Sequence, residues 1–162
     1  MKNKVIEDYL LKDQIGKGQY GKVYKAQNLK KPDQSNDVAI KVITNKKFSQ
    51  IPKLEELTRN EINLLSKIKN PNVVKFIEML RTTNNMYMVY ELCDGGNLEE
   101  YIHKKKKLPE SEALHLFKQI VNACYSLKKW NILHRDLKLQ NILLHKGVVK
   151  LADFGFCKLM SS

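Results

Sequence analysis

Charged and amide side chains gather in one short segment, His134-Arg135-Asp136-Leu137-Lys138-Leu139-Gln140-Asn141. Asp136 could accept a proton from an attacking hydroxyl, and Lys138 could neutralise negative charge on a phosphoryl group during its transfer. Asn141 could turn back toward a metal ion. Further along, Asp153-Phe154-Gly155 places a carboxylate between an apolar stretch and a glycine. Carboxylate and amide oxygens are hard ligands of the kind that Mg²⁺ prefers beside phosphates.

A glycine-rich segment, Gly16-Lys17-Gly18-Gln19-Tyr20-Gly21-Lys22-Val23, has the spacing GxGxxGxV. Glycines allow backbone amides to approach a phosphate closely and to adopt unusual dihedral angles. The same spacing marks dinucleotide-binding folds, in which it opens a helix. Here the β-type residues Val23 and Tyr24 follow, which favours a flap between two strands. A plain hairpin turn is the structural alternative.

Lys41 and Glu61 are candidates for a functional ion pair. Lys41 ends the apolar run Val38-Ala39-Ile40-Lys41, where it either faces solvent or points inward as a phosphate ligand. Glu61 shares one face of a predicted helix with apolar residues, which are Leu57, Leu64, Leu65 and Ile68. A carboxylate that faces the core is costly unless it is paired. Lys41 could supply the partner, and Glu61 could in turn orient Lys41 onto nucleotide phosphates.

The elements expected around these motifs divide the chain into a strand-rich half and a helix-rich half, with the break near Gly95-Gly96. Strands are predicted at residues 9–11, 22–26, 38–43, 73–80, 86–91, 142–144 and 148–152. Helices are predicted at residues 53–69, 98–103 and 109–129. One apolar face of the last helix is formed at helical spacing by Ala113, Phe117, Ile120, Val121, Cys124 and Leu127. The predicted fold class is therefore α+β.

Composition and charge limit the classes of protein that fit. The apolar fraction of 43% suffices for a core, and no apolar run approaches the roughly 18–20 residues that span a bilayer. The N-terminus lacks the apolar stretch of a signal peptide, so we expect an intracellular, cytoplasmic protein. The 3 cysteines form no CxxC pair, which argues against a disulfide framework or a zinc site.

The net charge of +12 comes almost entirely from lysine, because the only arginines are Arg59, Arg81 and Arg135. Readers of nucleic acid depend on arginine for bidentate contacts, and these lysines are spread along the whole chain. The dense run Lys104–Lys107 is interpreted as a solvated linker. We therefore expect no specific nucleic-acid partner.

Together and in this order, the four motifs resemble the signature set of the eukaryotic protein kinase family. The resemblance implies a two-lobed fold with an antiparallel N-lobe and one regulatory helix at residues 9–94. It also implies the first part of a mainly helical C-lobe at residues 95–162. Lys138 resembles the lysine of serine/threonine kinases. The segment Cys93–Leu98, together with Phe156, is similar to the autophagy-initiating kinases.

The resemblance also implies roles for individual residues. Lys41 would bind phosphates beside Glu61, Asp136 would be the catalytic base assisted by Lys138, and the Mg²⁺ ligands would be Asn141 and Asp153. The residues implied to contact ATP are Ile15, Gly16, Lys17, Gly18, Gln19, Tyr20, Gly21, Lys22, Val23, Ala39, Lys41, Glu91, Cys93 and Leu143. Tyr90 would be the gatekeeper, and the apolar spine would comprise Leu65, Phe76, His134 and Phe154.

The implied function is transfer of the γ-phosphoryl group of ATP, with Mg²⁺, to a serine or threonine hydroxyl of a protein substrate. The sequence ends at Ser162, before the Ala-Pro-Glu anchor of the family, so we expect an incomplete gene product or a fragment. The alternative function is therefore a non-catalytic ATP-binding or regulatory fragment. Ser161 and Ser162 are candidate phosphosites by position only. Cys157 is either a reactive thiol near the nucleotide or an inert, half-buried cysteine.

Overall fold

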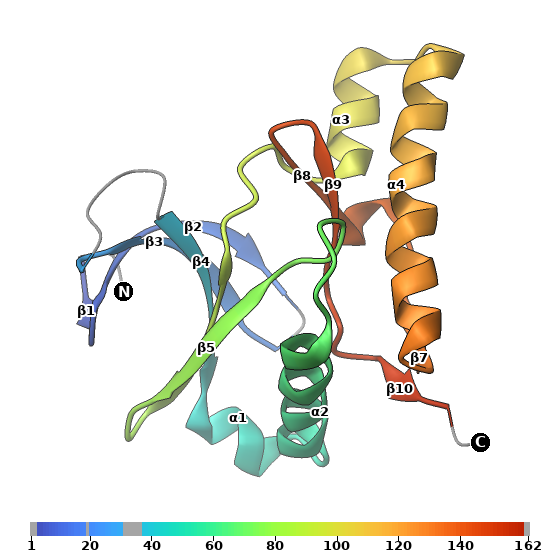
Figure 1. Ribbon diagram of the computed structural model, residues 1–162. Helices are drawn as coiled ribbons and strands as arrows, with labels where there is room; N and C mark the ends of the chain where they lie inside the picture. The colour runs from blue at the N-terminus through green and yellow to red at the C-terminus, as the bar shows by residue number, and fades with distance from the viewer. Residues whose placement is uncertain (1–2, 19, 31–36, 161–162) are drawn as a thin grey trace. The chain divides into compact units, whose positions relative to one another are not determined.

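The computed structural model describes residues 3–18, 20–30 and 37–160, which form an α+β fold with two compact units (Figure 1). The first unit contains the chain up to Glu55 and the segment Phe76–Leu92. The second unit contains Glu56–Lys75 and the chain from Cys93 onward. The lobe boundaries 9–94 and 95–162 that the family resemblance implies stay a prediction.

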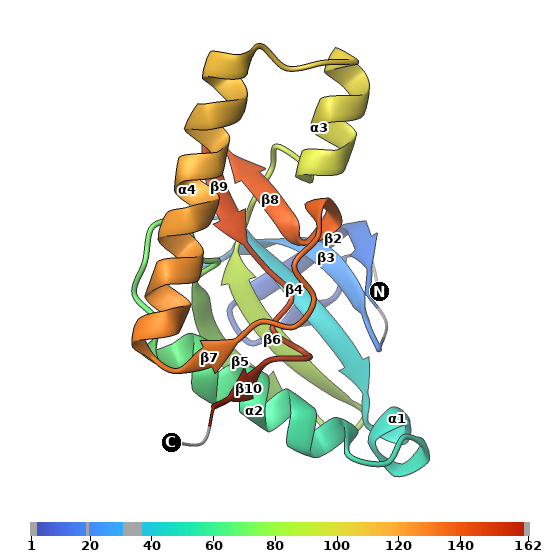
Figure 2. The ribbon, with the colours of Figure 1, turned by 90° about the vertical axis from the view of Figure 1, so that its right-hand side faces the viewer.

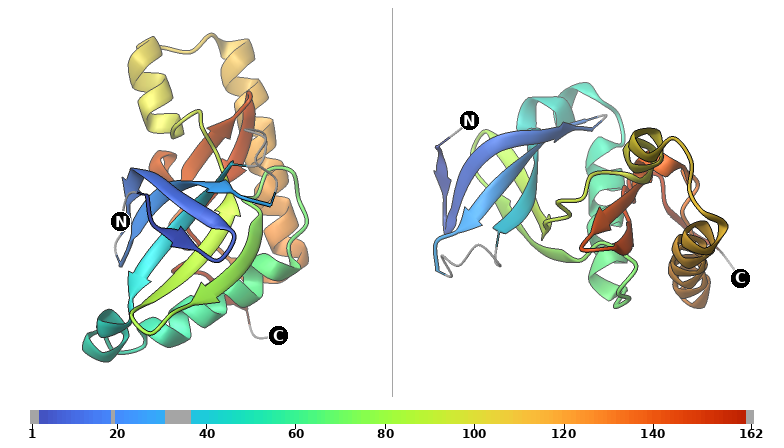
Figure 3. Two further views of the ribbon diagram at one scale, coloured as in Figure 1. Left: turned by 90° about the vertical axis from the view of Figure 1, so that its left-hand side faces the viewer. Right: turned by 90° about the horizontal axis from the view of Figure 1, so that it is seen from above.

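The first unit is built on a six-stranded antiparallel sheet with strand order β1-β2-β3-β4-β6-β5 (Figure 3). Its strands are β1 (Val5–Ile6), β2 (Tyr9–Lys17), β3 (Lys22–Asn28), β4 (Asp37–Thr44), β5 (Phe76–Arg81) and β6 (Asn85–Glu91). A short helix, α1 (Asn45–Gln50), follows β4 directly. The strands expected from sequence are confirmed, whereas β1 and α1 were not predicted. β5 begins at Phe76 because Val73 instead makes a parallel bridge with Leu151 in the second unit.

One face of this sheet carries the apolar core of the first unit. Val38, Ile40 and Val42 alternate along β4 and are buried among side chains of the neighbouring strands. Their cross-strand partners include Tyr24 and Ala26 on β3, and Tyr87 and Val89 on β6. Since successive side chains of a strand point to opposite faces, the residues between them on β4 belong to the other face of the sheet. That other face holds Ala39 and Lys41.

The second unit combines helices with two small pairs of strands. The helices are α2 (Leu54–Lys67), α3 (Leu98–Lys105) and α4 (Glu110–Lys129), and a 3₁₀ turn, η2 (Leu139–Asn141), follows. The first two residues of α2 are assigned to the first unit. The strand pairs are β8 (Ile142–His145) with β9 (Val148–Leu151), and β7 (Ile132–Leu133) with β10 (Lys158–Leu159). Figure 2 shows the β8–β9 hairpin beside α4, which β9 contacts.

A network of side-chain amides around the buried Asn72 attaches β9 to α4. The Asn72 Nδ2 group donates to Gln119 Oε1 at 3.0 Å and to the Val149 carbonyl at 3.1 Å. Asn72 Oδ1 accepts from Asn122 Nδ2 at 2.8 Å, and Gln119 Oε1 also accepts from the Val149 amide at 2.9 Å. Buried polar groups are stable only when they are hydrogen-bonded in this way. The network therefore fixes the strand that leads into Asp153.

The helix ends follow the signals in the sequence. Asn97 caps α3 by accepting a hydrogen bond from the Glu100 amide at 2.9 Å. The cap of α4 is Pro109, and acidic residues in its first turn and lysines in its last turn suit the helix macrodipole. Among the described residues, no helix is both long enough and apolar enough to cross a membrane.

Only part of the predicted apolar face of α4 is buried. Leu116, Ala123 and Leu127 are buried, whereas the side chains of Phe117 and Val121 are 60% and 49% exposed. Ala113 is exposed as well, so of the predicted apolar face only Leu127 is buried, and Ile120 and Cys124 are half-buried. Apolar side chains occupy more than one face of α4, and periodicity alone does not decide which face meets a partner. The exposed apolar residues of the helix are Leu114, Phe117, Val121 and Tyr125.

We expect Leu127→Ala to lower the free energy of unfolding by about 2–5 kcal/mol, because deleting a buried leucine side chain leaves a cavity. Phe117→Ala on the exposed face should change it by no more than about 0.5 kcal/mol. Urea unfolding of the whole chain, followed by circular dichroism, measures both. Equal losses in the two variants would mean that the exposed face is buried in solution.

Candidate active site

Two predicted catalytic residues and one predicted Mg²⁺ ligand form one hydrogen-bonded cluster in the second unit. The Asp136 Oδ2 atom accepts from Lys138 Nζ at 2.8 Å and from Asn141 Nδ2 at 2.8 Å. Asn141 Nδ2 also donates to the Asp136 carbonyl oxygen at 2.8 Å. The carbonyl oxygen of Asn141 accepts from the Ala152 amide at 2.9 Å, which ties the cluster to the end of β9.

The contact between Asp136 and Lys138 favours the charged form of both side chains. The hydrogen bond from Lys138 lowers the pKa of Asp136 below its ordinary value, and desolvation opposes this effect only in part. The same hydrogen bond raises the pKa of Lys138. At neutral pH the carboxylate is therefore ionised and the ammonium is protonated. An ionised Asp136 is in the state that accepts a proton from a hydroxyl.

Asp153 lies just after β9 as an exposed carboxylate. Its φ angle of 61° is in the left-handed region, which is uncommon for a residue other than glycine. The Gly155 amide contacts Asp153 Oδ1 at 3.4 Å, and the side chain of Phe154 between them is only 1% exposed. A buried neighbour thus anchors the backbone that presents the Asp153 carboxylate.

The oxygen atoms of Asn141 and Asp153 suit a Mg²⁺ ion. Because the Nδ2 group of Asn141 is engaged by Asp136, the amide oxygen is the atom that would coordinate a metal. An amide oxygen and an exposed carboxylate are hard oxygen ligands, and Mg²⁺ takes its other ligands from phosphates and water. The donor set therefore fits the metal that the resemblance implies.

His134 supports this loop as a neutral imidazole. Its Nδ1 atom accepts from the Asp136 amide at 3.3 Å, so Nε2 carries the proton and donates to the Ala152 carbonyl at 3.0 Å. The ring meets the edge of Phe154 at a centroid distance of 5.1 Å. Burial lowers the pKa of His134, although the Ala152 carbonyl and nearby carboxylates act in the opposite direction. His134 thus links the backbone of Asp136 to the end of β9.

The first unit presents other predicted residues on the face of its sheet opposite the core. The register places Val23 of β3 and Met88 of β6 opposite Lys41. In the neighbouring row it places Lys25 and Tyr90 opposite Ala39. Lys41 is half-buried on this face. Three of the predicted ATP contacts, Val23, Ala39 and Lys41, therefore lie together.

The glycine-rich segment joins β2 to β3, and no helix follows it. The dinucleotide-type alternative is therefore wrong. Gly18 N donates to the Gly21 carbonyl at 2.9 Å, and a Cβ atom on Gly21 would lie 2.5 Å from the Val42 carbonyl oxygen. Only glycine fits this approach to β4. Gln19 lies outside the described residues, as do Ser161 and Ser162.

Lys47 of α1 is a residue of this region that sequence reasoning missed. Its Nζ atom donates to the Tyr20 carbonyl at 2.8 Å. The segment Asn45–Gln50 has no buried residue and no apolar periodicity, so no pattern in the sequence indicates either the helix or this contact.

The remaining predicted contacts are distributed over both units. In the first unit, Lys17 and Lys22 are exposed, Ile15 is 49% exposed, and Glu91 is half-buried at the end of β6. Cys93 and Leu143, in the second unit, are half-buried. Their roles as ATP contacts stay predictions.

Glu61 is buried on α2, with 4% of its surface exposed. It belongs to the second unit and Lys41 to the first, so their pairing stays a prediction. The same holds for the apolar spine, whose Phe76 belongs to the first unit.

Within the first unit, the ring of Tyr90 contacts Phe76 edge-on, and the Tyr90 hydroxyl donates to Met88 Sδ at 3.7 Å. Its role as gatekeeper also stays a prediction.

Cys157 is an inert rather than a reactive thiol. Burial, with smaller contributions from the Glu61 and Asp153 carboxylates, raises the pKa of Cys157 to about 12. Its Sγ atom donates to the His134 carbonyl at 3.5 Å. Since the thiolate is the nucleophile, a raised pKa suppresses its reactivity.

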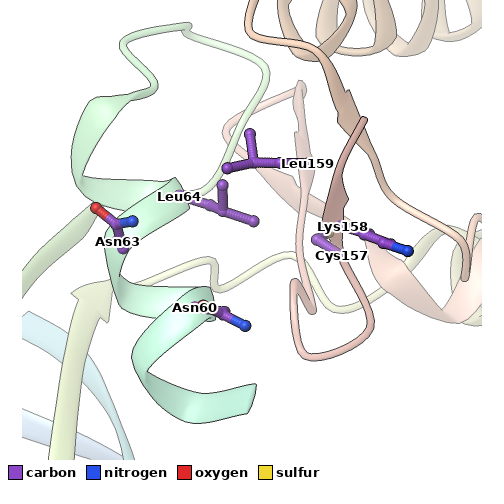
Figure 4. Close-up of a pocket in the computed structure, with 6 residues that line it drawn as sticks. All are labelled: Asn60, Asn63, Leu64, Cys157, Lys158 and Leu159. Atoms are coloured by element: carbon purple, nitrogen blue, oxygen red, sulfur yellow. The ribbon is translucent and has the colours of Figure 1, made fainter. Parts of the chain in front are cut away.

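A hollow of about 220 Å³ lies beside Cys157, between α2 and β10 (Figure 4). It is lined by Asn60, Asn63, Leu64, Cys157, Lys158 and Leu159. None of the predicted catalytic, ATP-contacting or metal-binding residues lines it. The hollow therefore shares no lining residue with the Asp136 cluster.

Comparisons with known proteins agree with the motifs. The family model for the protein kinase domain matches residues 9–162. The chain is 38% identical over 159 residues to serine/threonine-protein kinase ATG1b of Arabidopsis thaliana, covering 96% of this chain and 22% of the relative. It is also 38% identical over 159 residues to human serine/threonine-protein kinase ULK3, covering 96% and 33%.

A third relative, the human hormonally up-regulated neu tumor-associated kinase, is 36% identical over 155 residues, which cover 94% of this chain and 21% of the relative. The chain thus spans between 21% and 33% of the length of these curated relatives.

We expect the stability of the chain to fall as the pH drops from about 7 to 5, in part because of His134. Its pKa is lower in the folded chain than in the unfolded chain, where it is about 6.5. The unfolded state therefore binds more protons below about pH 6.5, which disfavours folding. His134→Gln should reduce this slope, measured from melting temperatures between pH 5 and 8. An unchanged slope in the variant would show that His134 is protonated equally in both states.

Proposed function

Because the chain belongs to the protein kinase family, we propose that it supplies the ATP-binding and phosphoryl-transfer residues of a serine/threonine protein kinase. The observation that carries this proposal is the cluster in which Lys138 and Asn141 both donate to Asp136 Oδ2 at 2.8 Å. The chain spans only 21–33% of the length of these relatives, so the activity is a proposal.

Asp136 is proposed to act on the substrate hydroxyl. The serine or threonine oxygen attacks the γ-phosphorus, the bond from that phosphorus to the β–γ bridging oxygen breaks, and ADP leaves. The hydroxyl proton passes to the Asp136 carboxylate, which is ionised because Lys138 lowers its pKa. Lys138, held 2.8 Å from that carboxylate, neutralises charge on the phosphoryl group in transfer. No enzyme-bound intermediate is required.

Asn141 and Asp153 are proposed to hold Mg²⁺ through the amide oxygen and the carboxylate. When bound, the ion would neutralise the phosphate oxygens and orient them for displacement in line. Both side chains are already restrained. Asn141 is hydrogen-bonded to Asp136, and Asp153 precedes the buried Phe154. Asn141 and Asp153 are therefore proposed to offer a preorganised pair of oxygen atoms.

The sheet face that carries Val23, Ala39 and Lys41 is proposed to contact ATP. Val23, Ala39, Ile15 and Leu143 would supply apolar surface to adenine, and Lys41 would bind phosphates with Glu61 as its partner. Backbone groups of Glu91 and Cys93 would hydrogen-bond adenine. The bulky Tyr90 side chain would narrow the space behind it. A protein substrate and a cytoplasmic location complete the proposal.

We expect the 162-residue chain to bind Mg·ATP, and Lys41→Met and Asp153→Asn each to weaken binding at least about tenfold. The physical reason is that each variant removes a charge from the proposed phosphate or metal site. Isothermal titration calorimetry measures the affinity. Lys118→Met, an exposed lysine on α4, is the matched control and should bind as the parent chain does. Equal affinity in the parent chain and Lys41→Met would refute the proposed site.

Phosphate transfer to a basic protein separates catalysis from binding. Asp136→Asn should lower the rate of transfer about 10²–10⁴-fold while Mg·ATP binding is retained. Binding of Mg·ATP without any transfer would instead support the non-catalytic alternative.

A further inference from the structure

The α1 helix reaches the glycine-rich segment although 27 residues separate the two contact points in the chain. The Lys47 Nζ atom donates to the Tyr20 carbonyl oxygen at 2.8 Å in a partly buried contact. Both residues belong to the first unit. A hydrogen bond from a charged donor is shorter and stronger than one between neutral groups. This contact therefore restrains the backbone of the loop at Tyr20.

The position of α1 is itself fixed by polar contacts at its start. The Asn45 Nδ2 group donates to the carbonyls of Thr82 and Thr83 at 3.1 and 2.8 Å. The Asn45 amide donates to the Asn84 carbonyl at 2.8 Å. These acceptors lie in the turn between β5 and β6, so the sheet holds the base of the helix. Lys47 thus extends from a fixed base.

Packing and helix propensity do not account for α1. The helix spans Asn45–Gln50 and contains no buried residue. Helices this short are not stable in water by themselves. The hydrogen bonds of Asn45 to the β5–β6 turn hold the start of the helix, and Lys47 joins the helix to the glycine-rich segment. The helix therefore connects the β5–β6 turn to the glycine-rich segment through hydrogen bonds.

The glycine-rich segment is held at two points. Gly21 lies against the Val42 carbonyl of β4, closely enough to exclude any side chain. The Tyr20 carbonyl is held by Lys47. Ordering a flexible loop around a ligand costs conformational entropy, and a contact that orders it beforehand reduces that cost.

We propose that Lys47 is a positioning residue that orders the glycine-rich segment for nucleotide phosphates, an inference that rests on the proposed ATP-binding function. Lys47 acts through the Tyr20 carbonyl and not through the nucleotide itself. Its effect is therefore confined to ligands that carry phosphates. Adenosine, which lacks them, would contact Val23 on strand β3 and not the loop at Tyr20 that Lys47 holds.

The neighbouring Lys46 provides the matched control. It is exposed and carries the same charge, whereas Lys47 is half-buried and hydrogen-bonded. Lys46→Met removes one positive charge beside the segment without removing the contact to Tyr20. Lys47→Met removes both charge and contact, and Lys47→Arg keeps the charge and N–H donors.

The test measures the affinities of the 162-residue chain for Mg·ATP and for adenosine by calorimetry. Lys47→Met should weaken Mg·ATP binding about tenfold and change adenosine binding less than about twofold. Lys47→Arg should recover most of the loss, and Lys46→Met should bind as the parent chain does. Lys47→Gln, a milder change, replaces Lys47→Met if that variant does not fold.

Three results would overturn the inference. Parent-like Mg·ATP affinity in Lys47→Met, or in its glutamine replacement, would show that the contact does not matter. An equal loss in Lys46→Met would assign the effect to net charge. A parallel loss of adenosine affinity, or a lower melting temperature without ligand, would indicate a purely structural role. Failure of the parent chain to bind Mg·ATP would instead overturn the proposed function, and this inference with it.

Discussion

The shared hydrogen bonds on the Asp136 carboxylate are the constraint on which the second unit's loops depend. Lys138 and Asn141 donate to the same oxygen, and Asn141 passes the constraint to Ala152 through its own carbonyl. His134 completes this hydrogen-bond network. Its ring accepts from the Asp136 amide and donates to the Ala152 carbonyl. Loss of one member would release both loops, so the groups proposed for catalysis and for metal binding are positioned as one assembly.

The β-strand that ends beside Asp153 is fixed from its other side as well. Asn72, Gln119 and Asn122 form a chain of amides that holds Val149 of β9 against α4. The buried Asn72 amide is satisfied by the half-buried Gln119 and the exposed Asn122, and leaving it unpaired would be costly. The carboxylate of Asp153 is thus presented by a strand that has little freedom to shift. Rigid support beneath an exposed reactive group favours precise positioning over adaptability.

Sequence periodicity was sufficient for the long elements and insufficient for the short ones. The pattern of α2, with Glu61 among apolar residues, predicted both the helix and the burial of that carboxylate. α1, β1, β7 and β10 span too few residues for any period to emerge, and two-residue strands depend on partners distant in the chain. The sequence could not predict which side of α4 is buried, because Leu116 and Phe117 are apolar neighbours and only packing buries the first and leaves the second exposed. Motif order sufficed for the Asp136 cluster, whereas Lys47 has no sequence signal at all.

The interleaving of the two units along the chain has a consequence for dividing the protein. The chain passes from one unit to the other after Glu55, after Lys75 and after Leu92. Cleavage at the last of these points would leave Glu56–Lys75 on the N-terminal piece, although Val73 and Val74 pair with Leu151 on the other piece. Neither unit is therefore a contiguous segment that a single cut can liberate. To obtain either unit alone, two separate segments of the chain would have to be joined.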